Sequence, residues 1–279
     1  MPMYRIIFRT CDAVHSLHAA PRPFGLDKPT LIRLCFLSLY DSLQGLPFEI
    51  TIVGDRLSDE IRAFFGRFPS VNVLNFPGGL GNDESIRETI RQALAMPDDD
   101  WVYFCEDDYL HTPQAMPFID AFIRNRLSIL DYSRHQKNFM RLLVGRLSTK
   151  PLVIHPTDYP DRYLDKYKRL SFLFLSEHCH WRQITNTTFT FLMQVRDARR
   201  FQRLLFHCAR RANDRRLSRK LYGRLFFKWR PALGVSPIPG LAAHLHEGVM
   251  PPLVDWQTII DGVRQRYAEL MASEISGRE

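Results

Sequence analysis

The stretch that most constrains this chain of 279 residues is Trp101–Tyr109, in which five apolar or aromatic residues run directly into three carboxylates. A short, unbroken apolar run of this kind is typical of a strand that is buried on both faces, and such strands belong to parallel sheets. Glu106, Asp107 and Asp108 follow at the carboxyl end of that strand, which is where open α/β sheets bind ligands. The stretch therefore predicts an α/β fold with an acidic site at one edge of its sheet.

The three adjacent acids predict a bound cation. Neighbouring carboxylates repel one another, and burying them is costly unless a positive charge neutralises them. If the chain stays extended, Glu106 and Asp108 point to the same side and Asp107 points to the other. Two carboxylates with open coordination positions commonly hold Mg²⁺ or Mn²⁺ against a diphosphate. The alternative for an E-D-D sequence is an ordinary solvated turn.

The first hundred residues alternate between strand and helix patterns. Strands are predicted at 4–9, 48–53, 71–76 and 101–105, and helices at 28–43, about 58–67 and 84–94, the last capped by Asn82 or Asp83. Short connections between alternating elements favour a parallel, right-handed, doubly wound sheet flanked by helices. Further strands are predicted at 152–154 and 186–193, and a closing helix at 255–272.

Composition and missing motifs exclude several classes. The five cysteines form no C-x-x-C pair, which argues for a reducing compartment and against a disulfide framework or a zinc ribbon. We expect neither a signal peptide nor a membrane span, because no apolar run approaches 18 residues, and we expect a cytoplasmic protein. The sequence lacks a P-loop motif, which argues against a P-loop NTPase, and lacks a nucleophile-elbow motif, which argues against an α/β-hydrolase.

A βαβαβαβ half that ends in an acidic E-x-D motif resembles the GT-A class of nucleotide-sugar glycosyltransferases, family 2 in particular. R-T-C-D at 9–12 and V-G-D at 53–55 fit the donor site of that class, and the resemblance covers residues 4–110. It implies a divalent metal on the donor diphosphate, held by the acidic motif. Because Glu106 replaces the usual first aspartate, Asp108 is the safer ligand of the two.

The resemblance also implies roles for individual residues. The donor contacts that it implies are Arg9, Thr10, Asp12, Asp55, Asn82 and Asp107. The class often returns a late histidine to the metal, and the sequence G-L-A-A-H-L-H-E-G offers His244 or His246 for that position. The implied metal ligands are therefore Glu106, Asp108 and His246.

A proline-punctuated loop after residue 154 supplies two candidates for the catalytic base, Asp158 and Asp161. An inverting transfer needs a group that takes the proton of the acceptor hydroxyl, and a carboxylate in a loop over the sheet can do so. Capping of a solvated turn is the alternative role for either aspartate.

We expect one domain over residues 1–279, with a donor half at 1–110, an acceptor half at 111–250 and a C-terminal helix at 251–279. The expected activity is metal-dependent transfer of a sugar to a hydroxyl of a saccharide, glycolipid or lipid-linked acceptor, as in polysaccharide biosynthesis. The alternatives are a glycosyltransferase for modified DNA bases, a sugar nucleotidyltransferase and a nucleic-acid-binding protein without enzymatic activity.

Residues 196–230 hold thirteen Lys or Arg against two Asp, so this basic segment accounts for more than the net charge of +8. It can be a solvated helix face, a surface for an anionic membrane or a lipid-diphosphate acceptor, or a DNA contact. Each basic side chain near an anionic membrane contributes about 1 kcal/mol. We favour peripheral contact with the inner face of a membrane.

Overall fold

A central sheet of nine strands organises the computed structural model, which describes residues 3–12, 22–130, 147–164, 171–223 and 230–276. The strands are β1 (Tyr4–Thr10), β2 (Phe48–Asp55), β3 (Val71–Phe76), β4 (Trp101–Glu106), β6 (Leu152–Ile154), β7 (Leu173–Phe174), β8 (His180–Ile184), β9 (Phe191–Gln194) and β10 (Leu233–Ile238). Their order is β3-β2-β1-β4-β9-β6-β10-β8-β7. The first four strands are parallel, and β9 runs antiparallel to both β4 and β6.

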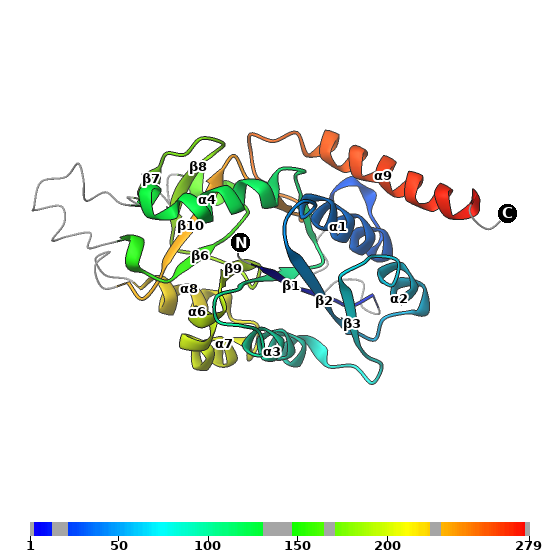
Figure 1. Ribbon diagram of the computed structural model, residues 1–279, viewed down its shortest axis with the longest axis horizontal. Coiled ribbons are helices and arrows are strands. Elements are labelled where there is room, and N and C mark those ends of the chain that lie inside the picture. The colour runs from blue at the N-terminus through cyan, green and yellow to red at the C-terminus, as the bar shows by residue number, and fades with distance from the viewer. Residues whose placement is uncertain (1–2, 13–21, 131–146, 165–170, 224–229, 277–279) are drawn as a thin grey trace, which may run out of the picture.

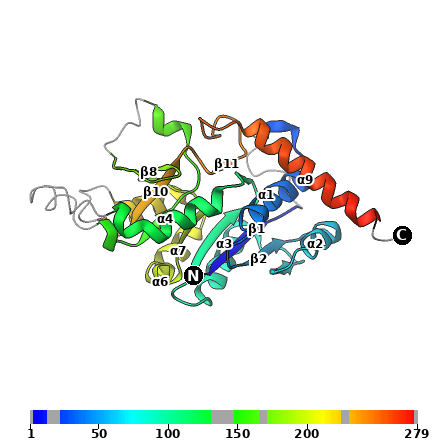
Figure 2. The same cartoon turned by 45° about the horizontal axis from the view of Figure 1, so that its top comes forward.

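Helices cover both faces of this sheet (Figures 1 and 2). The helices are α1 (Lys28–Ser42), α2 (Asp59–Phe65), α3 (Gly81–Leu94), α4 (Ala115–Leu130), α6 (Val195–Arg200), α7 (Gln202–Ala209), α8 (Asp214–Tyr222) and α9 (Trp256–Ser276). In β1, Ile6 and Phe8 pack into the core with α1 and α2, whereas Ile7 packs with α3 on the opposite face. The predicted fold class, a mostly parallel α/β sheet flanked by helices, is confirmed.

A second sheet of two antiparallel strands, β5 (Tyr109–His111) and β11 (Ala242–His244), lies beyond the end of β4. Leu110 and Ala243 of this sheet pack in a hydrophobic cluster with Trp256 and Ile260 of α9 and with residues of α1. The pairing joins the end of the predicted donor half to a loop from the predicted acceptor half. The division into those halves stays a prediction.

Two local predictions are wrong. Helix α3 begins at Gly81 rather than Glu84, because Asp55 accepts the backbone N–H groups of Leu80 and Gly81. Asp55 thereby caps the end of the sequence P-G-G-L-G at 77–81, which we call the glycine turn. The strand predicted at 186–193 begins only at Phe191, since the Thr188 hydroxyl accepts the N–H of Thr190 and holds the chain in a local turn. Among the described helices, none is both long and apolar enough to cross a membrane.

Close packing between β10 and α8 gives a first test of the fold. In Gly234→Ala, the new Cβ would lie 2.5 Å from the ring of Tyr222. Overpacking of a filled core costs about 1–3 kcal/mol, so we expect that loss in the free energy of unfolding, measured with urea.

Gly262→Ala in α9 is the control, because no atom lies within 4 Å of its added Cβ. Alanine forms helix better than glycine, so this variant should gain about 0.5–1 kcal/mol. Equal stability of Gly234→Ala and the unchanged protein would contradict the packing described for α8.

Candidate active site

The acidic run does not stay extended, and this corrects the prediction that Glu106 and Asp108 face one side together. Strand β4 ends at Glu106, and a turn at Asp107 and Asp108 leads into β5. Each of the three carboxylates therefore meets a different cationic partner. Glu106 pairs with Arg9, Asp107 with Lys28, and Asp108 with His244.

Asp108 lies beside two histidines from the distant loop. The Nε2 atom of His244 is 3.1 Å from Asp108 Oδ2, and that of His246 is 4.0 Å from the same oxygen. One potential ligand atom from each residue lies within 4.8 Å of the others. The strand pairing of β5 and β11 produces this cluster, and the backbone N–H of Leu245 also donates to the carbonyl of Asp108 at 2.8 Å.

Electrostatics favour the charged forms of this pair. Burial alone would raise the pKa of Asp108, but the charge and hydrogen bond of His244 lower it below its usual value. Burial alone would lower the pKa of His244, and the charge of Asp108 raises it instead. Asp108 is therefore an anion, ready to act as a hard oxygen ligand.

A network of hydroxyl groups orients His244. Its Nδ1 lies 3.2 Å from the Tyr159 hydroxyl, and its ring stacks on Tyr109 at 4.8 Å between ring centroids. The Tyr109 hydroxyl lies 2.9 Å from both Tyr159 Oη and Thr188 Oγ1, and Thr188 approaches the buried His155. Without a metal, His244 Nε2 lies 3.1 Å from Asp108 Oδ2 in a hydrogen bond, and a metal would bind this nitrogen by displacing its proton while Nδ1 keeps its contact with Tyr159.

The residues of this cluster fit a divalent cation. Asp108 Oδ1 is a buried oxygen with no hydrogen-bond partner in the described part of the chain. The three side chains keep between 22% and 27% of their surface accessible, so an ion can reach them. One carboxylate and two imidazoles suit Mn²⁺ better than Mg²⁺, which prefers oxygen ligands. The metal role of His246 stays a prediction that this geometry favours.

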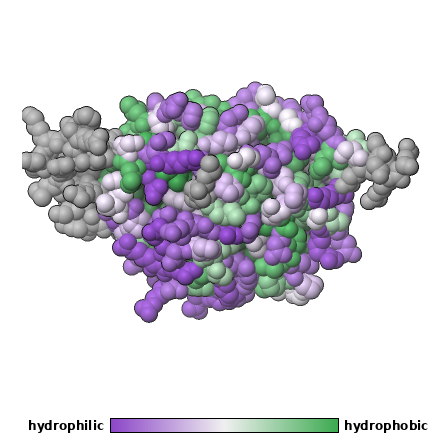
Figure 3. All heavy atoms as spheres, in the orientation of Figure 1, coloured by the Kyte–Doolittle hydropathy of each residue, from purple (hydrophilic) through white to green (hydrophobic). Residues whose placement is uncertain are grey.

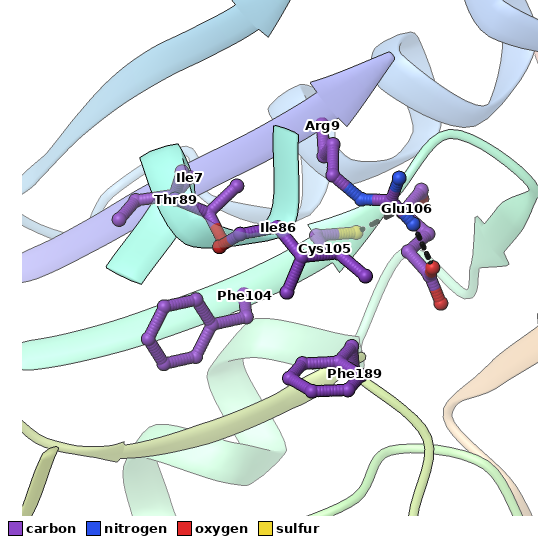
Figure 4. Close-up of a pocket in the computed structure, with 8 residues that line it drawn as sticks. All are labelled: Ile7, Arg9, Ile86, Thr89, Phe104, Cys105, Glu106 and Phe189. Carbon is purple, nitrogen blue, oxygen red and sulfur yellow. Dashed lines mark hydrogen bonds and ion pairs between the residues drawn. The ribbon is translucent and has the colours of Figure 1, made fainter. Parts of the chain in front are cut away.

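Glu106 has a different environment from Asp108. Its carboxylate faces Arg9, which also donates to Asn82 Oδ1 at 2.9 Å, and Thr190 Oγ1 lies 3.3 Å from its other oxygen. Figure 4 shows the Arg9 and Glu106 side chains pointing toward each other beside a small cavity between α3 and the ends of β1 and β4, with Phe104 on its wall. The structure does not bring Glu106 into the cluster of Asp108 and the histidines, and its role as a ligand stays a prediction.

The remaining predicted donor contacts lie along the same edge of the sheet. Asp107 accepts from Thr10 Oγ1 at 2.7 Å and from Lys28 Nζ at 2.6 Å, so it ties β1 to α1. Asp12 accepts the backbone N–H of Ser58 at the start of α2. Asp55 is buried beneath the glycine turn. Each polar group is engaged by the protein, and their contacts with a donor stay predictions.

Asp158, one of the two predicted catalytic aspartates, is poorly placed to take up a proton. Asp158 is only 1% exposed, and it lies 3.3 Å from Arg162 Nη1 and 3.6 Å from Arg182 Nη1 while accepting from the Tyr163 hydroxyl. Asp161 sits in a short 3₁₀ turn, and its Oδ1 is buried. Their catalytic role stays a prediction, and the contacts of Asp158 favour a structural one.

Asp214, the first residue of α8, was not predicted to take part in the site. Its Oδ1 is buried and has no hydrogen-bond partner among the described residues. Burial raises the pKa of Asp214 to about 7, and the negative charge of Glu106 adds to that rise, while Arg9 and His244 oppose it. Charged residues from three strands, β1, β4 and β11, therefore influence the pKa of Asp214. Asp214 was not singled out from the sequence because it lies within the basic segment, which we interpreted as a surface.

No protein-family profile matches this chain, and no curated protein sequence matches it either. Among solved structures, it is similar to residues 1–349 of TarS from S. aureus, with 14% identity and a TM-score of 0.39 over 70% of this chain and 47% of that one. It is also similar to the galactosyltransferase LgtC in complex with donor and acceptor sugar analogues, with 8% identity and a TM-score of 0.38 over 77% of this chain and 69% of that one.

TarS and LgtC are GT-A glycosyltransferases, the class that the sequence resembles. This chain spans about half the length of the TarS fragment. At such identities and TM-scores the likeness carries no functional weight, and the chemistry of the site has to decide.

The hydroxyl that orients His244 can be tested directly. Tyr159→Phe keeps the ring but removes the contact with His244 Nδ1, and loss of such a supporting group typically weakens metal affinity 10- to 100-fold. Calorimetric titration with Mn²⁺ measures the change. Tyr163→Phe is the control, because that hydroxyl donates to Asp158 and not to a histidine of the cluster. Equal Mn²⁺ affinities for both variants would contradict the orienting role.

Proposed function

We propose that the protein is a metal-dependent glycosyltransferase that moves a sugar from a nucleotide-sugar donor to an acceptor hydroxyl. The observation that carries the proposal is the cluster of Asp108, His244 and His246 at the carboxyl ends of the parallel strands. That edge is where α/β sheets bind nucleotides, and a diphosphate needs a cation beside it. Arg9 and Asn82 lie along the same edge, where a donor can meet them.

When bound, a divalent cation supplies positive charge that stabilises a nucleoside diphosphate as the leaving group. Asp108 and the two histidines would hold that cation. Tyr159 and Tyr109 fix the orientation of His244, so little rearrangement is needed on binding. Asp107 anchors Lys28 beside the site and Glu106 anchors Arg9, which keeps two cations close to the edge where the diphosphate would lie.

Asp108→Asn tests this function. The amide removes the anionic ligand but keeps the size of the side chain, so metal-dependent binding and turnover should be lost while the fold remains. A thermal-shift panel of UDP, GDP and CDP, with and without Mn²⁺, would measure binding, because a ligand at 100 times its Kd stabilises the fold by about 2.7 kcal/mol. Release of nucleoside diphosphate from the corresponding nucleotide sugars would measure turnover.

Asp99→Asn is the matched control, since Asp99 is exposed and contacts only the surface residue Arg196 among the described side chains. It should behave like the unchanged protein. Full turnover by Asp108→Asn, or full turnover by the unchanged protein in excess chelator, would contradict the proposal. Release of pyrophosphate from a sugar phosphate and a nucleoside triphosphate would instead indicate a nucleotidyltransferase.

The acceptor is proposed to lie at or near an anionic membrane. Helices α7 and α8 and the turn between them expose seven cations: Arg203, Arg210, Arg211, Arg215, Arg216, Arg219 and Lys220. In the described part of the chain, no carboxylate forms an ion pair with these seven side chains, which we call the cationic surface. Figure 3 shows a largely hydrophilic surface over α6, α7 and α8. Residues 224–229 of the predicted basic segment lie outside the described residues.

Replacing Arg211, Arg215, Arg216 and Arg219 with Gln should release the protein from vesicles that contain phosphatidylglycerol. At about 1 kcal/mol for each cation, affinity should fall on the order of 10²- to 10³-fold. Co-sedimentation at increasing salt measures this, and binding should weaken as the screening length falls below about 8 Å.

A control with the same change of net charge replaces four arginines that already have carboxylate partners: Arg62, Arg87, Arg91 and Arg264. That variant should sediment with vesicles almost as the unchanged protein does. Equal release of both variants from the vesicles would mean that net charge alone matters and would contradict a specific cationic surface. Loss of duplex DNA binding only in the variant of the cationic surface would favour the nucleic-acid alternative.

A further inference from the structure

We propose that Asp214 is the catalytic base, the group that takes the proton of the acceptor hydroxyl during an inverting transfer. The inference rests on the proposed glycosyltransferase function and names a residue for the step that Asp158 and Asp161 were predicted to perform.

The position of Asp214 is fixed by the packing of α8. Leu217 and Leu221 are fully buried against the sheet, and Ser218 Oγ accepts the N–H of Thr187 at 3.0 Å. Just before the helix, the backbone N–H of Arg211 donates to Asp83 in the first turn of α3 at 2.8 Å. The amino end of α8 is therefore held against the donor edge of the sheet.

Asp214 differs from the other acids of the site in having neither a cationic side chain nor a backbone N–H as a partner in the described part of the chain. Glu106, Asp107 and Asp108 each pair with a cationic side chain. Asp55 accepts two backbone N–H groups. For Asp214, no ion pair occurs among the described residues, and its Oδ1 is buried without a hydrogen-bond partner. A carboxylate with one buried, unpartnered oxygen and a partly exposed side chain is suited to accept a proton from a bound hydroxyl.

The charged groups around Asp214 come from three elements: Arg9 at the end of β1, Glu106 at the end of β4 and His244 at the end of β11. Burial raises the pKa of Asp214 to about 7, so it is a stronger base than an exposed aspartate. Its carboxylate is charged, and able to act, above that pH.

In the proposed step, the acceptor oxygen attacks the anomeric carbon of the sugar while its proton passes to an oxygen of Asp214. The bond between the anomeric carbon and the β-phosphate oxygen breaks, and its electron pair leaves with the nucleoside diphosphate. The protonated Asp214 later releases its proton to solvent. Because attack and departure occur on opposite faces, the anomeric configuration inverts.

Asp214→Asn is the decisive variant, with metal-dependent hydrolysis of a nucleotide sugar as the assay, because water can replace the acceptor. The amide cannot take a proton, so we expect kcat to fall 10²- to 10⁴-fold. The KM for the donor and the Kd for Mn²⁺ with UDP should stay within about twofold, because a base acts in the transition state and not in ground-state binding. In the unchanged protein kcat/KM should rise with pH as Asp214 loses its proton and then level off, and this rise should disappear in the variant.

Asp59→Asn separates catalysis from a structural effect, because Asp59 is likewise the first residue of a helix, α2, but is exposed and lies outside the site. It should keep both the rate and the pH profile.

Asp214→Asn should lower the rate but raise the stability of the folded protein at high pH. Since the folded protein favours neutral Asp214, stability is lost as pH rises through about 7, so Asp214→Asn should unfold at a higher temperature than the unchanged protein at about pH 8 and at a similar one at about pH 4.

An Asp214→Asn variant that keeps its rate within threefold of the unchanged protein, or a pH profile that the substitution does not alter, would overturn the assignment while leaving the proposed function intact. If the unchanged protein neither binds UDP, GDP or CDP with Mn²⁺ nor hydrolyses their sugars, the proposed function fails and the assignment fails with it.

Discussion

The antiparallel pairing of β5 with β11 is the constraint on which the candidate site depends. It places His244 opposite Tyr109 and brings a loop from near the end of the chain against the turn that carries Asp108. Leu110 and Ala243 bury this pair of strands with α1 and α9, so the hydrophobic cluster that holds the strands also holds the candidate metal ligands. The free energy of packing is thereby used to bring one carboxylate and two imidazoles together, which lowers the cost of assembling the site when a cation binds.

Three consecutive carboxylates are stable at one strand end because each has its own cation. Arg9, Lys28 and His244 come from β1, α1 and β11, so neutralisation of the acids also joins these three elements. Only Asp108 has partners that can themselves bind a metal. The repulsion among the acids therefore does not require a metal at Glu106 or Asp107, and the site for a cation is displaced toward the histidines.

The sequence was sufficient to predict the four parallel strands, their helices and the acidic edge, because these features depend on local patterns of apolar residues. From a short loop motif it also offered His244 or His246 as a metal ligand; both lie within 4.0 Å of Asp108, and the metal role stays a prediction. It could not show that the chain turns after Glu106, because an extended and a turned E-D-D run have the same composition. Tyr159 and Asp214 were not predicted because they interact with residues far away in the chain, and the run of arginines around Asp214 suggested a surface instead of a site.

The position of the bound cation tests the central claim most directly. Crystals grown with Mn²⁺ and UDP, measured by anomalous diffraction at the manganese edge, would locate the ion independently of any assay. The account predicts one anomalous peak within bonding distance of Asp108, His244 and His246, with the diphosphate on the open side of the ion toward Arg9. A peak between Glu106 and Asp107, or a bound diphosphate with no ion beside the histidines, would contradict it.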